Sequence, residues 1–316
     1  MNNKTLSWDN LKNYSSVVAI YPNGRQVTLS YIDRTLPAAQ WKELDALHYF
    51  GETGATKGIP LELVSDSLIG KDQLKEVKEW SVIRASLIQT TINDESFKSL
   101  LLSLESKNIS SVVINDLLKE WDIKKNESDF ISAVEKTYIP SEKTLIFKAL
   151  ELIKRVHATP QKDDKPDLPY YNHPVVVATY AIQLGLDSNA VIAALLHDVI
   201  EDTDETETML RITFPEKSID YVVKMTKKKE EERDTYLGKF STYSEEVKTL
   251  KSLDRFHNLL RAFTFINKPK YWERYINETE KHFYPEFMKN QLLSPFVLKF
   301  YRYLEELKKL LASSQQ

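Results

Sequence analysis

The sequence predicts a mainly α-helical protein in which a helical domain follows a smaller α+β domain with a β-hairpin. Of the 7 glycines in 316 residues, two follow residue 71, Gly185 and Gly238. Because glycine favours turns and weakens helices, its scarcity indicates that most of the later chain is helical. Pro140 followed by Ser141 indicates a helix start, since proline ends the preceding helix and serine caps the next one. We therefore expect two domains, at 1–140 and 141–316.

The first domain is expected to begin with the hairpin. The runs 14–21 and 25–32 are rich in β-branched and aromatic residues, and Pro22-Asn23-Gly24 between them suits a tight turn. Apolar residues at helical spacing then predict three helices, at 38–50, 71–90 and 96–105. No group of residues in this domain has the spacing of a metal or catalytic site. Its role stays open, with binding of a protein partner as one alternative.

The second domain is expected to be helical throughout. An amphipathic helix is predicted at 144–157, followed by a polar, proline-containing loop at 160–169. Asp187-Ser188 supplies N-cap residues in front of the apolar run 190–196, which predicts a buried helix. The segment His197-Asp198-Val199-Ile200-Glu201-Asp202-Thr203 follows without a break and is expected to form the last turns of the same helix.

Composition excludes several classes of protein. The chain has no cysteine, which excludes disulfides and metal sites with thiolate ligands. A net charge of −3 gives no support for binding a nucleic-acid backbone. The N-terminus has no apolar signal segment, and no apolar run approaches the ~18 residues of a membrane span. We therefore expect a cytoplasmic protein that binds neither nucleic acid nor membrane.

Charged groups crowd the end of the predicted buried helix, where His197 and Asp198 directly follow its apolar run. Buried charge without a partner is costly, so such groups are usually paired, hydrogen-bonded or bound to a metal. Two further groups can join them: His173 at a loop-to-helix corner, and Asp254 within an apolar helical pattern. Two imidazoles and two carboxylates suit Mn²⁺, Fe²⁺, Zn²⁺ or Ni²⁺ and leave positions open for water and substrate. For His173, a structural role is the alternative.

Other common chemistries lack their residues in this chain. The sequence contains no glycine-rich phosphate loop, no EF-hand loop and no Gly-x-Ser-x-Gly motif around a nucleophile. Attack by a metal-activated water is the reaction type that remains.

The order of His173, His197-Asp198 and Asp254 resembles the pattern of the HD superfamily of metal-dependent phosphohydrolases. More narrowly, His-Asp-x-x-Glu-Asp-Thr at 197–203 resembles the hydrolase domain of RelA/SpoT enzymes and of the stand-alone metazoan SpoT homologues. Further matches between about 144 and 290 are Pro169-Tyr170, His173-Pro174, Ala193-Ala194-Leu195-Leu196, Phe214, Asp254-Arg255, His257-Asn258, Glu278-Thr279 and Tyr284-Pro285. Ordered agreement over a segment of this length is more specific than any single motif.

The resemblance implies an all-helical hydrolase domain that uses Mn²⁺, with another divalent transition metal as the alternative. It assigns four metal ligands, which are His173, His197, Asp198 and Asp254. It also implies that the acidic pair Glu201 and Asp202 positions or activates the attacking water. For this pair, orientation of the imidazole ligands is the alternative.

The same resemblance places three residues at the substrate. Asn258 corresponds to a residue that lines the nucleotide site, and Lys162 to a lysine in the loop before Pro-Tyr. Arg255 is the third, with ion pairing or packing as an equal alternative. Two residues depart from the family: Gln161 stands where an arginine stacks on the purine, and Leu253 replaces a small residue before the aspartate. The nucleotide preference therefore stays open.

The function that the resemblance implies is hydrolysis of a phosphorylated nucleotide. Release of the 3′-pyrophosphate from (p)ppGpp, the nucleotide of the stringent response, is the first choice. One alternative is a phosphatase that acts on NADPH or another nucleotide. The other is a nucleotide-sensing module whose N-terminal domain binds a partner or ligand.

Overall fold

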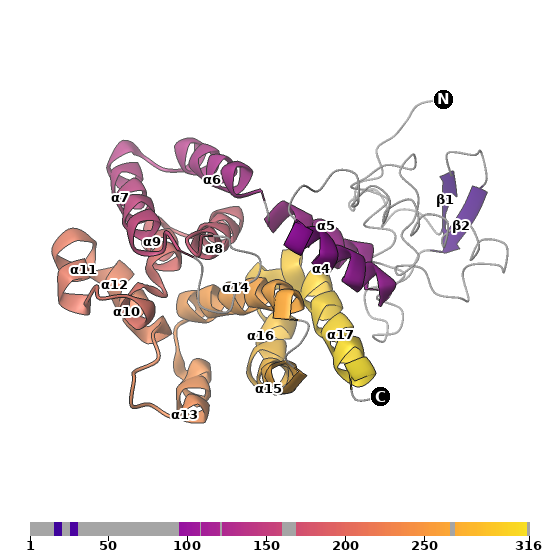
Figure 1. Cartoon of the computed structure of the whole chain (residues 1–316). Coiled ribbons are helices and arrows are strands. Elements are labelled where there is room, and N and C mark those ends of the chain that lie inside the picture. Colours follow the sequence, from indigo (N-terminus) through magenta and orange to yellow (C-terminus); the bar gives the residue numbers. More distant parts are fainter. Residues whose placement is uncertain are drawn as a thin grey trace. The chain divides into compact units, whose positions relative to one another are not determined.

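A computed structural model describes residues 16–20, 26–30, 95–107, 109–120, 122–159, 169–265 and 269–314 (Figure 1). The chain divides into two compact units, residues 1–115 and 116–316. Helix α5 (Ser111–Glu120) contains the boundary between them. Each unit is described by itself below.

The first unit contains two strands and a helix among its described residues. Strand β1 (Ser16–Ile20) pairs antiparallel with β2 (Gln26–Ser30), so that Val18 lies opposite Thr28. Helix α4 (Glu95–Ser106) confirms the helix expected at 96–105. The turn at 21–25 and the helices expected at 38–50 and 71–90 lie outside the described residues. The α+β character of this domain therefore stays a prediction.

The regular elements that the structure describes in the second unit are all helices. Its helices are α6 (Ile123–Thr137), α7 (Pro140–Val156), α8 (Asn172–Gln183), α9 (Ser188–Leu196), α10 (Val199–Asp202), α11 (Glu207–Thr213), α12 (Glu216–Met225), α13 (Arg233–Gly238), α14 (Glu245–Arg261), α15 (Pro269–Glu278), α16 (Tyr284–Lys289) and α17 (Val297–Ser314). Shorter helical turns join some of them, including a π-helical turn, η5 (Thr279–Phe283). No helix in the described ranges combines the length and apolarity that a membrane crossing requires.

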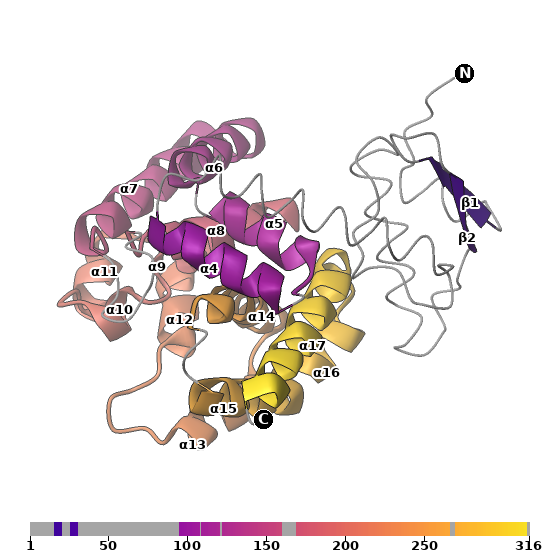
Figure 2. The same cartoon turned by 45° about the vertical axis from the view of Figure 1, so that its right-hand side comes forward.

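Helix α9 is the centre of the packing that positions the candidate site (Figures 1 and 2). It packs against α7, α8 and α12, while α14 packs against α8, α9 and α12. Apart from Asn189, every residue of α9 is buried, as expected for a helix that is apolar all round. Burial of a leucine such as Leu195 or Leu196 stabilises the fold by about 1.5–3 kcal/mol. Asp187 caps this helix as predicted, since its carboxylate accepts the Ala190 N–H at 2.9 Å.

The helix predicted to continue to Thr203 is interrupted, and this prediction is wrong. Helix α9 ends at Leu196, and Asp198 (φ −98°, ψ −5°) begins the separate short helix α10. The break has a consequence for the site. Neighbouring residues in a continuous helix point about 100° apart. Outside a continuous helix, the side chains of His197 and Asp198 can face the same point.

Pro140 is the first residue of α7, which confirms the helix start predicted there. Ser141 does not cap this helix as predicted, because Ile139 occupies the N-cap position and Ser141 lies within the first turn. Helix α6, which precedes it, packs against α8 within the second unit. The junction at 140 therefore lies between two helices of that unit. The division of the chain into folding domains stays a prediction.

Candidate metal centre

His173 lies in the first turn of α8 and is 2% exposed. Its backbone N–H donates to the Tyr170 carbonyl at 2.9 Å, which closes the turn in front of the helix. The side-chain amide of Asn172 donates to the backbone carbonyl and to Oε1 of Glu120 at 3.0 and 2.9 Å. These bonds fix the start of α8 and hence the position of the His173 ring.

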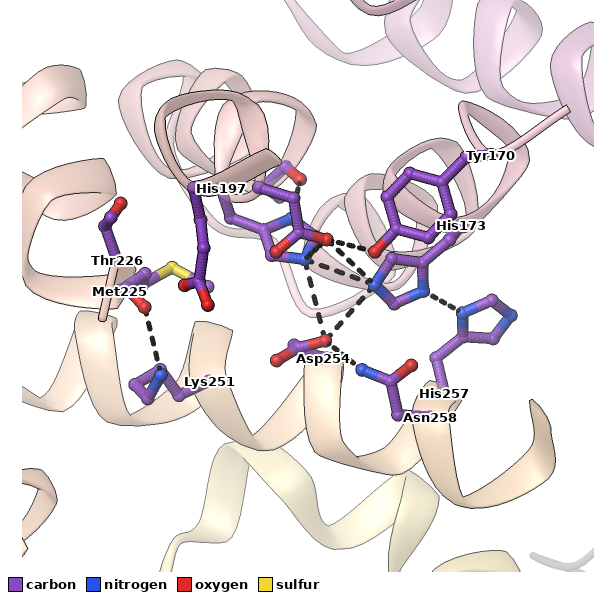
Figure 3. A network of polar contacts seen from close by, with 12 residues as sticks. Tyr170, His173, His197, Met225, Thr226, Lys251, Asp254, His257 and Asn258 are labelled. Atoms are coloured by element: carbon purple, nitrogen blue, oxygen red, sulfur yellow. Dashed lines mark hydrogen bonds and ion pairs between the residues drawn. The ribbon is translucent and has the colours of Figure 1, made fainter. Parts of the chain in front are cut away.

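His197 follows the last residue of α9 and is 3% exposed. Its Nδ1 lies 2.8 Å from the carbonyl oxygen of Ala194. Because a carbonyl oxygen only accepts hydrogen bonds, Nδ1 carries a hydrogen, and Nε2 is the nitrogen that can offer a lone pair to a cation. That Nε2 lies 3.2 Å from Nε2 of His173 (Figure 3).

Two carboxylate oxygens complete the cluster (Figure 3). Asp198 Oδ2 lies 3.1 Å from Nε2 of His197 and 3.7 Å from Nε2 of His173. Asp254, from α14, places Oδ1 3.2 Å from Nε2 of His173 and 3.5 Å from Nε2 of His197. The structure therefore brings together all four side chains that the sequence suggested as ligands, from three separate segments.

The spacing of these four atoms fits a divalent cation at their centre. Ligand atoms ~2.1 Å from a cation lie ~3.0 Å apart at right angles and ~3.4 Å apart at the tetrahedral angle. The five separations given above run from 3.1 to 3.7 Å. Lone pairs and carboxylates at such distances repel one another unless a positive charge lies between them. The ligand atoms of His173, His197 and Asp198 all lie within 4.8 Å of one another, and Asp254 is outside this closest group.

Two neighbouring side chains hold the carboxylates in place. The hydroxyl of Tyr170 donates a short hydrogen bond to Oδ2 of Asp198. The amide of Asn258, one turn beyond Asp254 on α14, donates to Oδ1 of that aspartate at 2.5 Å. Each oxygen near the two imidazoles thus has a fixed orientation.

The electrostatics of the cluster favour a positive charge. Burial opposes protonation of His197, but the carboxylates of Asp198 and Asp254 raise its pKa well above the ordinary 6.5. Burial likewise opposes ionisation of Asp254, yet the adjacent imidazoles of His173 and His197 hold its pKa well below the usual range. For His173, burial dominates and lowers the pKa to about 3. Near pH 7 both carboxylates are therefore charged and His173 is neutral, and His197 holds a proton that a bound cation would displace.

Glu201 and Asp202 lie in α10, the short helix that Asp198 begins, and both are exposed. The Glu201 carboxylate accepts the backbone N–H of Lys227 at 3.0 Å. Partial burial raises the pKa of Glu201, and the charge of Asp198 adds to the rise. Both acids line a pocket of about 640 Å³, and the four residues of the cluster are not among those that line it. A base with a raised pKa in an open pocket can take a proton from water.

Arg255 is turned to another part of the unit. As the neighbour of Asp254 on a continuous helix, it points about 100° round from it. Its guanidinium lies 4.0 Å from the ring centroid of Tyr275 and 3.5 Å from Oε2 of Glu278, and the residue is 5% exposed. The structure favours ion pairing and packing over substrate contact for this arginine. Lys162 lies outside the described residues.

Comparison with known proteins shows which protein family the segment around the candidate metal centre resembles. Residues 149–264 match a family model described as HD domain. The chain contains an HD domain. Its sequence is 38% identical over 101 residues to a probable guanosine-3′,5′-bis(diphosphate) 3′-pyrophosphohydrolase of Mycoplasma pneumoniae, covering 32% of this chain and 14% of that protein. It is 30% identical over 162 residues to a guanosine-3′,5′-bis(diphosphate) 3′-pyrophosphohydrolase of Borreliella burgdorferi, covering 48% and 24%.

The bifunctional (p)ppGpp synthase/hydrolase SpoT of Escherichia coli is also similar, with 29% identity over 133 residues, 39% of this chain and 19% of that protein. These relatives confirm the resemblance to RelA/SpoT hydrolases. The matched part of this chain spans a quarter or less of the length of each relative. A solved structure, described as a metazoan ortholog of SpoT that hydrolyzes ppGpp, is 21% identical with a TM-score of 0.42, covering 52% of this chain and 97% of that one.

The HD domain places further polar groups near the centre that sequence reasoning did not assign to the site; for His257 it left packing or ion pairing and substrate contact as equal alternatives. Tyr170 appeared only as part of a family match, yet it bonds to a proposed ligand. His257 places Nδ1 2.6 Å from Nδ1 of His173. Lys251, one turn before the aspartate of α14, is buried and donates to the Met225 carbonyl at 3.2 Å (Figure 3). Burial lowers the pKa of Lys251 to about 8. Lys251 lies three residues before Asp254 on the same face of α14, and this spacing is the sequence signal that could have indicated a role for the lysine.

Proposed function

We propose that this HD domain is a metal-dependent phosphohydrolase that releases the 3′-pyrophosphate of (p)ppGpp. The convergence of His173, His197, Asp198 and Asp254 at separations of 3.1–3.7 Å carries the proposal. The activity for which the similar proteins from M. pneumoniae and B. burgdorferi are named supports the choice of substrate. A nucleotide pyrophosphate is polyanionic, so it approaches two carboxylates only where a cation offsets their charge.

Mn²⁺ is the proposed cofactor, and the two imidazoles and two carboxylates would hold it. A nitrogen and oxygen ligand set suits this ion, as it does Fe²⁺, Zn²⁺ and Ni²⁺. When bound, the cation neutralises charge on phosphoryl oxygens and makes water more acidic.

The protein's own groups orient the reactants and handle the proton. Tyr170 and Asn258 hold the two aspartates through the hydrogen bonds described above. Glu201 accepts the proton of the attacking water, a role for which its raised pKa suits it. Asp202 orients the same water. Lys162 and Asn258 contact the nucleotide in this proposal.

A second candidate is a phosphatase that acts on NADPH or another nucleotide. The observation that favours it is Gln161, which stands where the family places an arginine against the purine. Glutamine has neither the charge nor the planar five-donor group of arginine. A site altered in this way can accept a different base.

The test is product analysis with the purified full chain in Mn²⁺. We expect ppGpp to yield GDP and pyrophosphate, and we expect Asp198→Ala and Asp254→Ala to abolish both metal binding and turnover. Glu201→Gln should keep metal binding and lower kcat by about 10²–10⁴-fold. Asp220→Ala, which changes an exposed aspartate paired with Arg211, is the matched control and should retain full activity.

Three results would change the assignment. Phosphate release from NADPH without turnover of ppGpp would favour the second candidate. Tight nucleotide binding with no product would favour a nucleotide sensor. Full activity of Asp198→Ala or Asp254→Ala would exclude the metal-dependent mechanism.

A further inference from the structure

A chain of buried hydrogen bonds leads from Glu120 through His257 to His173. Glu120 Oε2 lies 2.6 Å from Nε2 of His257, and Nδ1 of His257 lies 2.6 Å from Nδ1 of His173 (Figure 3 shows the second contact). On the other side of the His173 ring, Nε2 lies 3.2 Å from Nε2 of His197. The exposed fractions are 7% for Glu120, 0% for His257 and 2% for His173.

This chain is held rigidly on both sides. The other oxygen of Glu120 accepts the Asn172 amide at 2.9 Å, so both carboxylate oxygens have a defined donor. The rings of His257 and His173 are nearly coplanar and meet edge to edge, with centroids 4.9 Å apart and planes 13° apart. Glu120 ends α5 and therefore comes from outside residues 149–264, the segment that the HD family model matches.

The hydrogen-bonding groups determine where each hydrogen lies. A carboxylate only accepts, so Nε2 of His257 carries a hydrogen. A neutral imidazole has one N–H, which leaves Nδ1 of His257 as an acceptor. The facing Nδ1 of His173 must then donate. This leaves Nε2 of His173 with a lone pair directed at the two aspartates and at His197, where a cation would lie.

We propose that Glu120 and His257 are positioning residues that fix the tautomer and the ring orientation of His173 for metal binding. The inference rests on the proposed function, because it requires a cation at the four-residue cluster. A metal-bound histidine commonly donates its other N–H to a carboxylate or carbonyl, and loss of that partner weakens metal affinity by about 10–100-fold. In this protein a second histidine connects the ligand to the carboxylate.

The test measures Mn²⁺ affinity of the full chain by electron paramagnetic resonance, independently of turnover. Glu120→Gln keeps the size of the side chain but places an amide N–H₂ against either His257 or Asn172, both of which donate. We expect its affinity to fall by about 10–100-fold. Glu286→Gln is the matched control, because Glu286 is also buried (4% exposed) and also accepts an asparagine amide, and its affinity should stay unchanged.

A double-mutant cycle separates positioning from general destabilisation. If both residues act through one chain, Glu120→Gln should add little to the loss already caused by His257→Asn. Losses that add in full, or an affinity of Glu120→Gln within about twofold of the original, would overturn the inference. If the protein without substitutions binds no Mn²⁺, the proposed function is overturned as well. If it binds Mn²⁺ and Glu120→Gln binds it equally well, only the positioning role is overturned.

A second measurement needs no variant and covers the case in which Glu120→Gln does not fold. Long-range ¹H–¹⁵N spectra of the zinc-loaded full chain report which ring nitrogen of His173 carries hydrogen. We expect a protonated Nδ1 and a metal-bound Nε2. A hydrogen on Nε2, or metal binding through Nδ1, would overturn the inference.

Discussion

The substitution Asp254→Asn removes one carboxylate from the four-residue cluster and leaves its shape intact. The amide oxygen can still accept the Asn258 side chain, which lies 2.5 Å from Oδ1 of the aspartate. The negative charge is lost, and with it the attraction to a divalent cation among atoms 3.1–3.7 Å apart. We expect the variant to fold and to lose metal-dependent stabilisation.

The size of the effect follows from binding linkage. At a free Mn²⁺ concentration of 100 times Kd, binding stabilises the folded protein by about 2.7 kcal/mol. Residues 116–316 form the compact unit that contains the site. For a unit of this size, 1 kcal/mol shifts Tm by about 2–4 °C, so Mn²⁺ should raise the Tm of the original protein by about 5–11 °C.

For the variant, the loss is at least about 4 kcal/mol, the attraction between unit charges 4 Å apart at an effective dielectric constant of ~20. A loss of that size weakens Kd about 1,000-fold. At the same Mn²⁺ concentration the remaining stabilisation is below about 0.1 kcal/mol, and the shift in Tm is below about 1 °C.

The assay is thermal unfolding by circular dichroism, with and without Mn²⁺, after treatment with a chelator. Asp129→Asn is the control, because that aspartate is exposed and pairs only with Lys125 among the contacts of the structure. It should keep the full metal-dependent shift. A shift in Asp254→Asn that equals the shift of the original protein would refute the reasoning.

Three further predictions concern residues around the centre. Tyr170→Phe removes the hydroxyl that bonds to Asp198, so Mn²⁺ affinity measured by titration should fall about tenfold; an unchanged affinity would show that this bond does not orient the ligand. The pKa of Glu201 is raised, so if the glutamate acts as base, kcat should fall as the pH drops through a value above the ordinary 4.5. Glu201→Gln should no longer show this fall of kcat at low pH, and a variant that still shows it would assign the base to another residue. Leu253 is 0% exposed, so Leu253→Ala should lower the free energy of unfolding, measured in urea, by about 2–5 kcal/mol. A loss below about 1 kcal/mol would mean that neighbouring side chains fill the cavity left by the leucine.

Local sequence signals predicted the segments that form the centre. Asp187 caps α9 because its carboxylate lies in front of an apolar run, and both features are visible in the sequence. The motif order also indicated which four side chains meet, and the structure brings them together. Their role as metal ligands stays a proposal. The interruption at Asp198 was not predictable from periodicity, since residues 197–203 carry no proline or glycine to break a helix.

Contacts between distant segments could not be predicted in the same way. Glu120 and His257 are 137 residues apart, and neither stands in a local pattern that links it to the other. The direction of Arg255 depends on Glu278 and Tyr275, which α15 supplies. A motif gives the identity of a residue but not the side of the helix that its partners occupy. Only packing of the helices decides these two cases.

The central claim is that one divalent cation binds between the two imidazoles and the two aspartates. X-ray diffraction from crystals of the full chain grown with Mn²⁺, recorded at the manganese absorption edge, tests this directly. We predict one anomalous peak about 2.1 Å from Nε2 of His173 and His197 and from carboxylate oxygens of Asp198 and Asp254. A manganese peak elsewhere, with none between these four side chains, would contradict the account.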